Sequence, residues 1–282
     1  MNGIIVINKP QGITSRDVVN IAIKKLGIKK IGHTGTLDPI ATGVMVICIG
    51  PSTKLVDMLT SNDKEYIAEV TLGIKTDTLD ITGNVIDTLD VNVTKEAIIN
   101  VLNSFKGKYM QEVPIYSAVK INGKKLYEYA RCNEKITLPK REVEIKNIEL
   151  LDYNKNKFTF KCLVSKGTYI RSLIRDICDK LNTLGTMSKL TRTKQGKFSI
   201  DECISIDSIS RDNIKNIKDI LDIKKIIVDD YLKFKIINGQ ILDNIYNTNE
   251  VLFINNNEVL AIYKIYEKDN KKLKPYIVFF RK

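Results

Sequence analysis

The sequence predicts an α+β fold: a large domain followed by a small, mostly β module. Strand-like and helix-like segments are mixed without the regular strand–helix alternation of a doubly wound sheet. Hydrophobic residues make up 43% of the 282 residues, which is enough for an ordinary globular core. Near residue 226 the pattern changes to short strand-like pieces joined by polar turns. We therefore predict a large domain at 1–225 and a small module at 226–282.

Apolar runs, alternation and caps predict the elements of the first half of the chain. Thr14 or Ser15 can cap a helix whose apolar positions recur at helical spacing, and Gly27 closes it. Lys64–Gly73 alternates between apolar and polar residues, which predicts a strand with one polar face. The same patterns predict strands at Gly3–Asn8 and Val44–Ile49 and a helix at Thr94–Phe105.

The sequence of the second half of the chain predicts hairpins and one further helix. Tyr116–Ile121 is strand-like, and the Asn-Gly pair directly after it is a strong signal for a tight turn. Val143–Tyr153 and Lys157–Val164 are predicted to form a hairpin, after which Tyr169–Leu181 changes to helical periodicity. In the small module, we expect strands at Val251–Ile254, Val259–Tyr266 and Tyr276–Phe280.

The charge of the chain points to a polyanionic partner. Lys and Arg outnumber Asp and Glu by 45 to 33, which gives a net charge of +12. Such an excess most often serves long-range attraction to nucleic acid, although a lysine-rich composition that favours solubility is the alternative. Each basic residue taken singly also fits a solvated surface charge. Candidates for phosphate contact are Lys24, Lys25, Lys29, Lys30, Lys120, Lys124, Lys125, Arg131, Lys189, Arg192, Lys194 and Lys197.

Membrane, secreted and metal-dependent classes are disfavoured. No apolar run approaches the roughly 20 residues of a membrane span, and the first residues lack the pattern of a secretory signal. The five cysteines are scattered without Cys-x-x-Cys spacing, and the chain has one histidine, so a zinc site has few ligands available. We expect free thiols, a cytoplasmic location and no bound metal.

The densest motif is GHTGTLDPIATG, from Gly32 to Gly43. Its glycines permit close backbone approach or positive φ, and its threonine hydroxyls can bond local backbone groups and stiffen the loop. The loop presents Asp38 directly before Pro39 and near His33, the single histidine. A carboxylate held in this way is a candidate nucleophile or general base. An ordinary Asp-Pro turn is the alternative.

This segment resembles the signature of the bacterial tRNA pseudouridine-55 synthases, the TruB family, in which GHTGTLDP is followed by A-T-G-V-L. Met45 stands where the family often has the final Leu. The resemblance extends from Ile4 to Gly196, about two thirds of the chain. Further segments similar to the family follow in the family's order: Asn8–Ser15, Lys64–Tyr66, Thr76–Asp80, Pro114–Lys120, Leu126–Arg131 and Lys166–Arg171.

The resemblance implies a mixed, largely antiparallel sheet with helices packed on it, and an isomerase that uses no cofactor or metal. The implied substrate is uridine 55 in the T-arm loop of tRNA, which must be flipped out of its stack to react. Asp38 would form a covalent adduct with the target nucleotide, so that the uracil can detach, rotate and rejoin through carbon 5. Whether Asp38 attacks the ribose or acts there as a base is left open.

The resemblance also implies partners for Asp38. Arg171 is expected to pair with it, and Asp80 to bind the other side of the guanidinium, which gives an Asp–Arg–Asp network. A turn cap after Thr78 is the alternative for Asp80. Tyr66 is expected to stack on the target base and to handle one of its protons, with a buried aromatic on a strand as the alternative.

Further residues are expected to shape the binding site. Tyr169 and Leu190 would form apolar walls, with core packing as the alternative for Leu190. Lys9 and Pro10 would support the stacking tyrosine and the catalytic loop. His33 would contact the RNA loop, or serve as a structural donor, and has no proton-transfer role. The complete set of expected substrate-binding residues is His33, Tyr169, Leu190, Lys9, Pro10, Thr36 and Gly35.

Two RNA-contacting parts are implied outside the catalytic loop. The segment at about 112–141 resembles the family's mobile insertion, which closes over the RNA, and 226–282 resembles a short PUA-type RNA-binding module.

The sequence disfavours three other functions. Relatives that act in guide-RNA particles carry a Gly-His-Ser-Gly loop and basic extensions, whereas this chain has Thr34 and lacks them, so we expect a stand-alone monomer with no protein partner. An idle RNA-binding or RNA-chaperone protein is disfavoured, because binding alone would not need the aspartates, tyrosine and arginine together. A metal-dependent nuclease is disfavoured because the chain lacks a ligand cluster.

Overall fold

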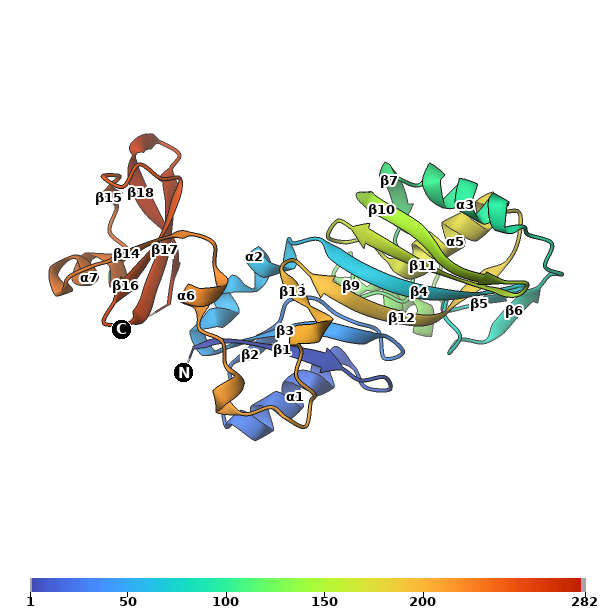
Figure 1. Ribbon diagram of the computed structural model, residues 1–282, viewed down its shortest axis with the longest axis horizontal. Helices are drawn as coiled ribbons and strands as arrows, with labels where there is room; N and C mark the ends of the chain where they lie inside the picture. The colour runs from blue at the N-terminus through green and yellow to red at the C-terminus, as the bar shows by residue number, and fades with distance from the viewer. Residues whose placement is uncertain (1, 280–282) are drawn as a thin grey trace.

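A nine-stranded sheet forms the larger part of the computed structural model, which describes residues 2–279 (Figure 1). Its strands are β1 (Gly3–Lys9), β2 (Ile31–His33), β3 (Thr42–Ile49), β4 (Lys64–Leu72), β7 (Gly107–Glu112), β10 (Lys140–Asn154), β11 (Lys157–Val164), β12 (Gly185–Gln195) and β13 (Phe198–Ser199). The strand order is β1-β3-β12-β4-β11-β10-β7, with β2 paired to β3 and β13 to β12. Among these described strands, β3 and β12 are the parallel pair and the others pair antiparallel. The prediction of a mixed, largely antiparallel sheet is confirmed.

The first helix begins and ends where the caps predict. The Thr14 hydroxyl accepts a hydrogen bond from the Asp17 backbone N–H, the Asp17 carboxylate accepts one from the Thr14 N–H, and Gly27 ends the helix at φ 71°. The helices are α1 (Ser15–Leu26), α2 (Val56–Thr60), α3 (Lys95–Ser104), α4 (Leu126–Arg131), α5 (Ile170–Lys180), α6 (Ile217–Ile220) and α7 (Asp230–Ile237). Short 3-10 turns are η1 (Gly50–Leu55), η2 (Ile200–Glu202) and η3 (Arg211–Asn213). None of the helices within residues 2–279 is long and apolar enough to cross a membrane.

Two small hairpins form separate two-stranded sheets, and the strands of the first, β5 and β6, are labelled in Figure 1. One consists of β5 (Ile74–Thr76) and β6 (Val85–Thr88), and the other of β8 (Lys120–Ile121) and β9 (Lys124–Lys125). The turn between β8 and β9 is the predicted Asn-Gly pair, whose two residues both adopt positive φ.

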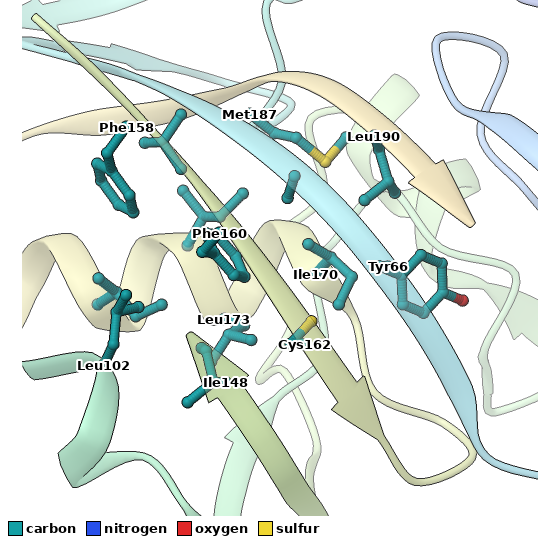
Figure 2. Close-up of a cluster of buried hydrophobic side chains, with 14 of the residues drawn as sticks. Tyr66, Leu102, Ile148, Phe158, Phe160, Cys162, Ile170, Leu173, Met187 and Leu190 are labelled. Atoms are coloured by element: carbon teal, nitrogen blue, oxygen red, sulfur yellow. The ribbon is translucent and has the colours of Figure 1, made fainter. Parts of the chain in front are cut away.

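The main core lies between one face of this sheet and the helices α3 and α5 (Figure 2). Strand β4 alternates buried and half-buried residues along its length, as its sequence pattern predicts. Phe158 and Phe160 of β11 and Leu173 of α5 fill the centre of the cluster. Tyr66 and Leu190 lie at one end of it, so these two side chains are backed by a closely packed core.

A second sheet follows in the last part of the chain. Its order is β14-β16-β17-β18-β15, from β14 (Lys224–Ile227), β15 (Leu242–Asp243), β16 (Glu250–Asn255), β17 (Glu258–Tyr266) and β18 (Asp269–Val278). The strands predicted in this region lie within β16, β17 and β18, except that Phe280 is outside the described residues. One buried cluster joins the two sheets, because Ile4 and Val46 of the first pack with Leu252 and Ile262 of the second. Together with Figure 1, this places the second sheet beside the β1–β3 end of the first.

The structure corrects one element prediction and adds a strand. Of the predicted strand Tyr116–Ile121, the last two residues alone are a strand, because the Ser117 N–H turns back to the Ile115 carbonyl and the Tyr116 carbonyl is bound by an arginine side chain. Strand β12 was not predicted, since its Lys, Thr and Arg residues obscure its alternation. It is nevertheless a central strand, between β3 and β4.

Candidate active site

The catalytic-loop candidate runs from β2 to β3 and is fixed at several points. The Ser15 hydroxyl accepts a hydrogen bond from the Leu37 N–H at 2.8 Å and donates to the Leu37 carbonyl at 3.0 Å. At the end of the loop, Gly43 has φ +103°, and a Cβ there would lie 2.2 Å from the Arg192 carbonyl oxygen. Only glycine fits this close approach of β3 to β12. Asp38 is therefore presented by a stiff segment held at both ends.

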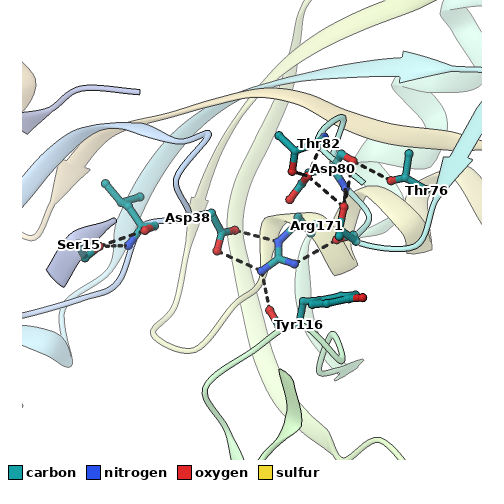
Figure 3. Close-up of polar contacts among 9 residues, drawn as sticks. Ser15, Asp38, Thr76, Asp80, Thr82, Tyr116 and Arg171 are labelled. Carbon is teal, nitrogen blue, oxygen red and sulfur yellow. Dashed lines mark hydrogen bonds and ion pairs between the residues drawn. The ribbon is translucent and has the colours of Figure 1, made fainter. Parts of the chain in front are cut away.

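Asp38 and Arg171 form a bidentate ion pair (Figure 3). The Arg171 Nε atom lies 2.8 Å from Asp38 Oδ2, and Nη2 donates to Oδ1 at 3.2 Å. The Nη1 atom donates to the Thr78 carbonyl at 3.1 Å, and Nη2 also donates to the Tyr116 carbonyl at 3.0 Å. The Arg171 side chain is 6% exposed and that of Asp38 is 32% exposed. The pair thus has a buried cation and a carboxylate that remains accessible.

Asp80 does not form the second half of the predicted Asp–Arg–Asp network. Its Oδ1 accepts hydrogen bonds from the Thr82 N–H at 3.0 Å and the Thr78 hydroxyl at 3.1 Å, and no ion pair with Arg171 occurs among the described residues. The Oδ1 atom is bonded within its own turn, as in the turn-cap alternative. The prediction is wrong at this point. Asp80 instead stabilises the turn that presents the Thr78 carbonyl to Arg171 (Figure 3).

A pocket of about 520 Å³ opens over the Asp38 carboxylate. Of the predicted residues, it brings together Gly35, Thr36, Asp38, Tyr66, Tyr169, Arg171 and Leu190. Burial raises the pKa of the Tyr66 phenol, against an opposing effect of the nearby Arg192 cation. Tyr66 is thus a protonated, largely buried ring at neutral pH that lines the same pocket as the Asp38 carboxylate.

His33 lies outside the pocket lining and acts within the loop. Its Nδ1 accepts a hydrogen bond from the Gly35 N–H at 3.3 Å. Burial lowers the pKa of the imidazole, and the cations Arg16 and Arg192 lower it further. His33 is therefore a neutral acceptor that shapes the loop at Gly35, directly before Thr36.

Lys9 and Pro10 also lie outside the pocket and border a separate cavity. The buried Lys9 ammonium donates to the carbonyls of Ile13 at 2.7 Å, Pro10 at 2.9 Å and Pro39 at 3.4 Å. Burial lowers its pKa to about 8. Lys9 thus ties the turn after β1 to the residue that follows Asp38, which supports the loop. No contact between Lys9 and the tyrosine ring is found among the described residues.

A family model described as TruB family pseudouridylate synthase (N terminal domain) matches residues 24–170, more than half of the chain. The chain belongs to the TruB family. A TruB-family relative from Clostridium tetani, named tRNA pseudouridine synthase B, is 46% identical over 245 residues, which cover 85% of each protein. One of the same name from Bacillus subtilis is 40% identical and covers 100% of this chain and 99% of its own length.

Solved structures share the fold. A Cbf5-Nop10-Gar1 complex contains a chain that is 26% identical, with a TM-score of 0.72 over 99% of this chain and 85% of the other. An H/ACA RNP bound to a substrate RNA containing 2'-deoxyuridine gives 25% identity and a TM-score of 0.71 at the same coverage. The fold of this TruB-family chain is therefore that of pseudouridine synthases.

Two residues of this TruB-family site were missed as site residues. Arg192, predicted as a surface phosphate contact, is 1% exposed and donates to the carbonyls of Val44 at 2.6 Å and Gly35 at 3.2 Å. The signal was available, because Arg192 is two residues from Leu190 and therefore on the same face of a strand. Gln111 is buried and bonds both the N–H and the carbonyl of Tyr169, where helix α5 starts.

Proposed function

We propose that this protein converts uridine 55 in the T-arm loop of tRNA to pseudouridine, as an isomerase that needs no cofactor. The observation that carries the proposal is the accessible Asp38 carboxylate, held bidentately by the buried Arg171 at the pocket that Tyr66 lines. The names of its 40–46% identical relatives support tRNA as the substrate.

In the net reaction one bond breaks and one forms. The bond from N1 of uracil to the ribose C1′ breaks, Asp38 forms a covalent adduct with the nucleotide, the freed uracil rotates and bonds to C1′ through C5, and the bond to Asp38 then breaks, which regenerates the carboxylate. The proton on C5 is lost and N1 gains one, so the product is an isomer of the substrate. Flipping the base out costs a few kcal/mol. Stacking on Tyr66 returns about 1–3 kcal/mol, and phosphate contacts supply the rest.

We further propose that residues 1–225 form the catalytic domain and that the insertion at about 112–141 clamps the RNA. Tyr127 of the insertion lies in the pocket lining, and two cations stack on its ring, Lys125 and Arg131, each 5.3 Å from the ring centroid. A ring and cations at the mouth of the pocket suit a single-stranded, splayed-out loop. Residues 226–282 are proposed as a PUA-like RNA-binding module.

We also propose that the chain acts as a monomer, without guide RNA or a protein partner. The structural neighbours belong to complexes with other proteins. Here one chain supplies the carboxylate, its guanidinium partner and the tyrosine of the pocket.

The test is tritium release from tRNA that carries uracil labelled at C5, with the purified chain as the sole protein. We expect one tritium per tRNA, with the modified position mapped to 55 and no release from a transcript in which that uridine is cytidine. Retained label under conditions where the tRNA binds would favour the RNA-chaperone function. Release at another position would overturn the assignment of uridine 55, and a requirement for guide RNA would overturn stand-alone action.

A further inference from the structure

Lys64 is a buried lysine that lines the pocket, and the reaction proposed above gives it no role. Strand β4 alternates, so Lys64 and Tyr66 lie on the same buried face, and both line the pocket over Asp38. Lys64 is 8% exposed, and its ammonium donates to the carbonyls of Thr60 at 2.9 Å and Asn62 at 2.7 Å. An ammonium has three donors, so one N–H has no hydrogen-bond acceptor among the described residues.

The end of the pocket near Lys64 carries an excess of positive charge. Arg192 lies directly opposite Tyr66 in the pairing of β12 with β4, and its guanidinium contacts two backbone carbonyls and the Tyr66 phenol, which are uncharged groups. No carboxylate within residues 2–279 lies within 4.0 Å of the charged atoms of Lys64 or Arg192, whereas the charge of Asp38 is already matched by Arg171. Two buried cations without a carboxylate are costly unless a bound anion compensates them.

The electrostatics of Lys64 agree with this geometry. The pKa of its ammonium is lowered to about 8, chiefly by burial and also by the cations Arg192 and Lys166, against an opposing effect of Asp63. The Gly35 backbone packs against both cations, since a Cβ there would lie 3.3 Å from Arg192 Nη1 and 3.6 Å from Lys64 Cε. The loop that carries Asp38 is thus in direct contact with this charged end of the pocket.

The anions closest to this site would be phosphates of the RNA substrate itself. A nucleotide whose ribose meets Asp38 brings a phosphate on either side of that ribose, and both are bonded to the reacting unit. We propose that Lys64 binds one of the two phosphates that flank the flipped uridine. This subsite rests on the proposed function, and it would hold the ribose in register with Asp38. Phosphate contacts of this kind position a nucleic acid without reading its sequence.

A purely structural role for Lys64 predicts a different result. If Lys64 serves only to bond the Thr60 and Asn62 carbonyls, removing its charge should not change RNA binding or turnover. Lys64→Gln separates the two functions, because the amide can still donate to both carbonyls but carries no charge. Lys64→Met removes both functions, and Lys64→Arg restores the charge. Lys157→Met is the matched control, since Lys157 pairs with Thr71 near the opposite end of β4.

The experiment uses a T-arm stem-loop RNA labelled at C5 of the target uracil, with a neutral methylphosphonate replacing either the 5′ or the 3′ flanking phosphate. For the wild-type protein and Lys157→Met, we expect kcat/KM to fall about tenfold at one of the two positions. Lys64→Gln should be about tenfold slower on the unmodified RNA and lose less than about twofold more on the same methylphosphonate. Lys64→Arg should regain the sensitivity.

Equal losses from methylphosphonate in the wild type and Lys64→Gln, at both positions, would overturn the subsite. A wild-type protein that releases tritium from no RNA would instead refute the proposed function. Equilibrium binding of the same RNAs to Asp38→Asn gives a readout that does not depend on turnover: the methylphosphonate at the sensitive position should weaken binding when Lys64 is present and should change it by less than about twofold when Lys64→Gln is added. An affinity that ignores the neutral phosphate in both backgrounds would also refute the subsite.

Discussion

Replacing Arg171 by lysine tests whether the pocket needs the shape of the guanidinium or only its charge. The arginine makes four polar contacts, two to Asp38 and one each to the carbonyls of Thr78 and Tyr116. A lysine ammonium on the same helix can keep one contact to the carboxylate, but it lacks the planar fork that reaches all three partners. Charge is therefore retained while geometry is lost.

The size of the effect follows from those contacts. Two carbonyls lose their donor, which costs about 1–3 kcal/mol each when the group is buried, and less where water can enter, as it can in this pocket. At about 1–2 kcal/mol for each carbonyl, the free energy of unfolding should fall by about 2–4 kcal/mol. Asp38 also becomes free to rotate, and a misplacement of about 1 Å in a reacting group costs roughly a hundredfold in rate. We expect single-turnover tritium release to slow by about 10²–10³-fold.

The assay compares Arg171→Lys with Arg175→Lys under saturating enzyme. Arg175 is the next arginine of the same helix and forms ion pairs with Glu112 at 2.9 Å and Asp176 at 2.8 Å, outside the pocket. Its lysine variant should keep turnover within about threefold of wild type, since no reacting group depends on it. Urea unfolding measures the stability of both. Wild-type turnover in Arg171→Lys would refute the argument that the fork positions Asp38.

Three further outcomes are expected. Asp38→Asn should lower tritium release by at least about 10⁴-fold with tRNA affinity within about threefold of wild type, by filter binding; near-normal turnover would contradict its assignment as nucleophile. Ser15→Ala should cost about 1–3 kcal/mol in urea unfolding, because the buried Leu37 N–H loses its acceptor, and unchanged stability would disagree with that contact. Burial raises the pKa of Cys48 and Cys178 to about 12, so the unfolded chain releases protons that the folded chain retains. The free energy of unfolding should therefore fall as the pH rises above about 9, and less steeply in Cys48→Ala; equal slopes would contradict the burial effect.

Local signals in the sequence predicted the elements that depend on local chemistry. The caps at Thr14 and Gly27 placed helix α1, and the alternation of Lys64–Gly73 placed β4 with the correct buried face. The loop that carries Asp38 was found from its own residues, and its pairing with Arg171 from the resemblance to the family. These features are encoded within short stretches of chain.

Features that depend on long-range packing were not predictable in the same way. Arg192 reads as a surface charge in sequence, and only its place on a central strand buries it. From the sequence, Asp80 could bind an arginine or groups of its own turn. In the structure, Leu79 adopts a positive φ, and the Thr82 N–H and hydroxyl donate to Asp80, so the carboxylate bonds its own turn. The position of Lys64 in the pocket likewise depends on which face of β4 is turned toward Asp38, and the sequence alone does not show this.

The central position of β12 also sets the order in which a ribosome can deliver a working pocket. Strands β1 to β3 and the group β4, β11, β10 and β7 can each pair before residue 185 is made, but they join only through β12. Leu190 and Arg192 of the pocket arrive with that strand. At about 5–20 residues per second, synthesis from the end of β11 to the end of β12 takes a few seconds, during which the sheet is in two halves with exposed strand edges. The delivery of β12 is therefore the step at which this chain gains both its continuous sheet and its complete pocket.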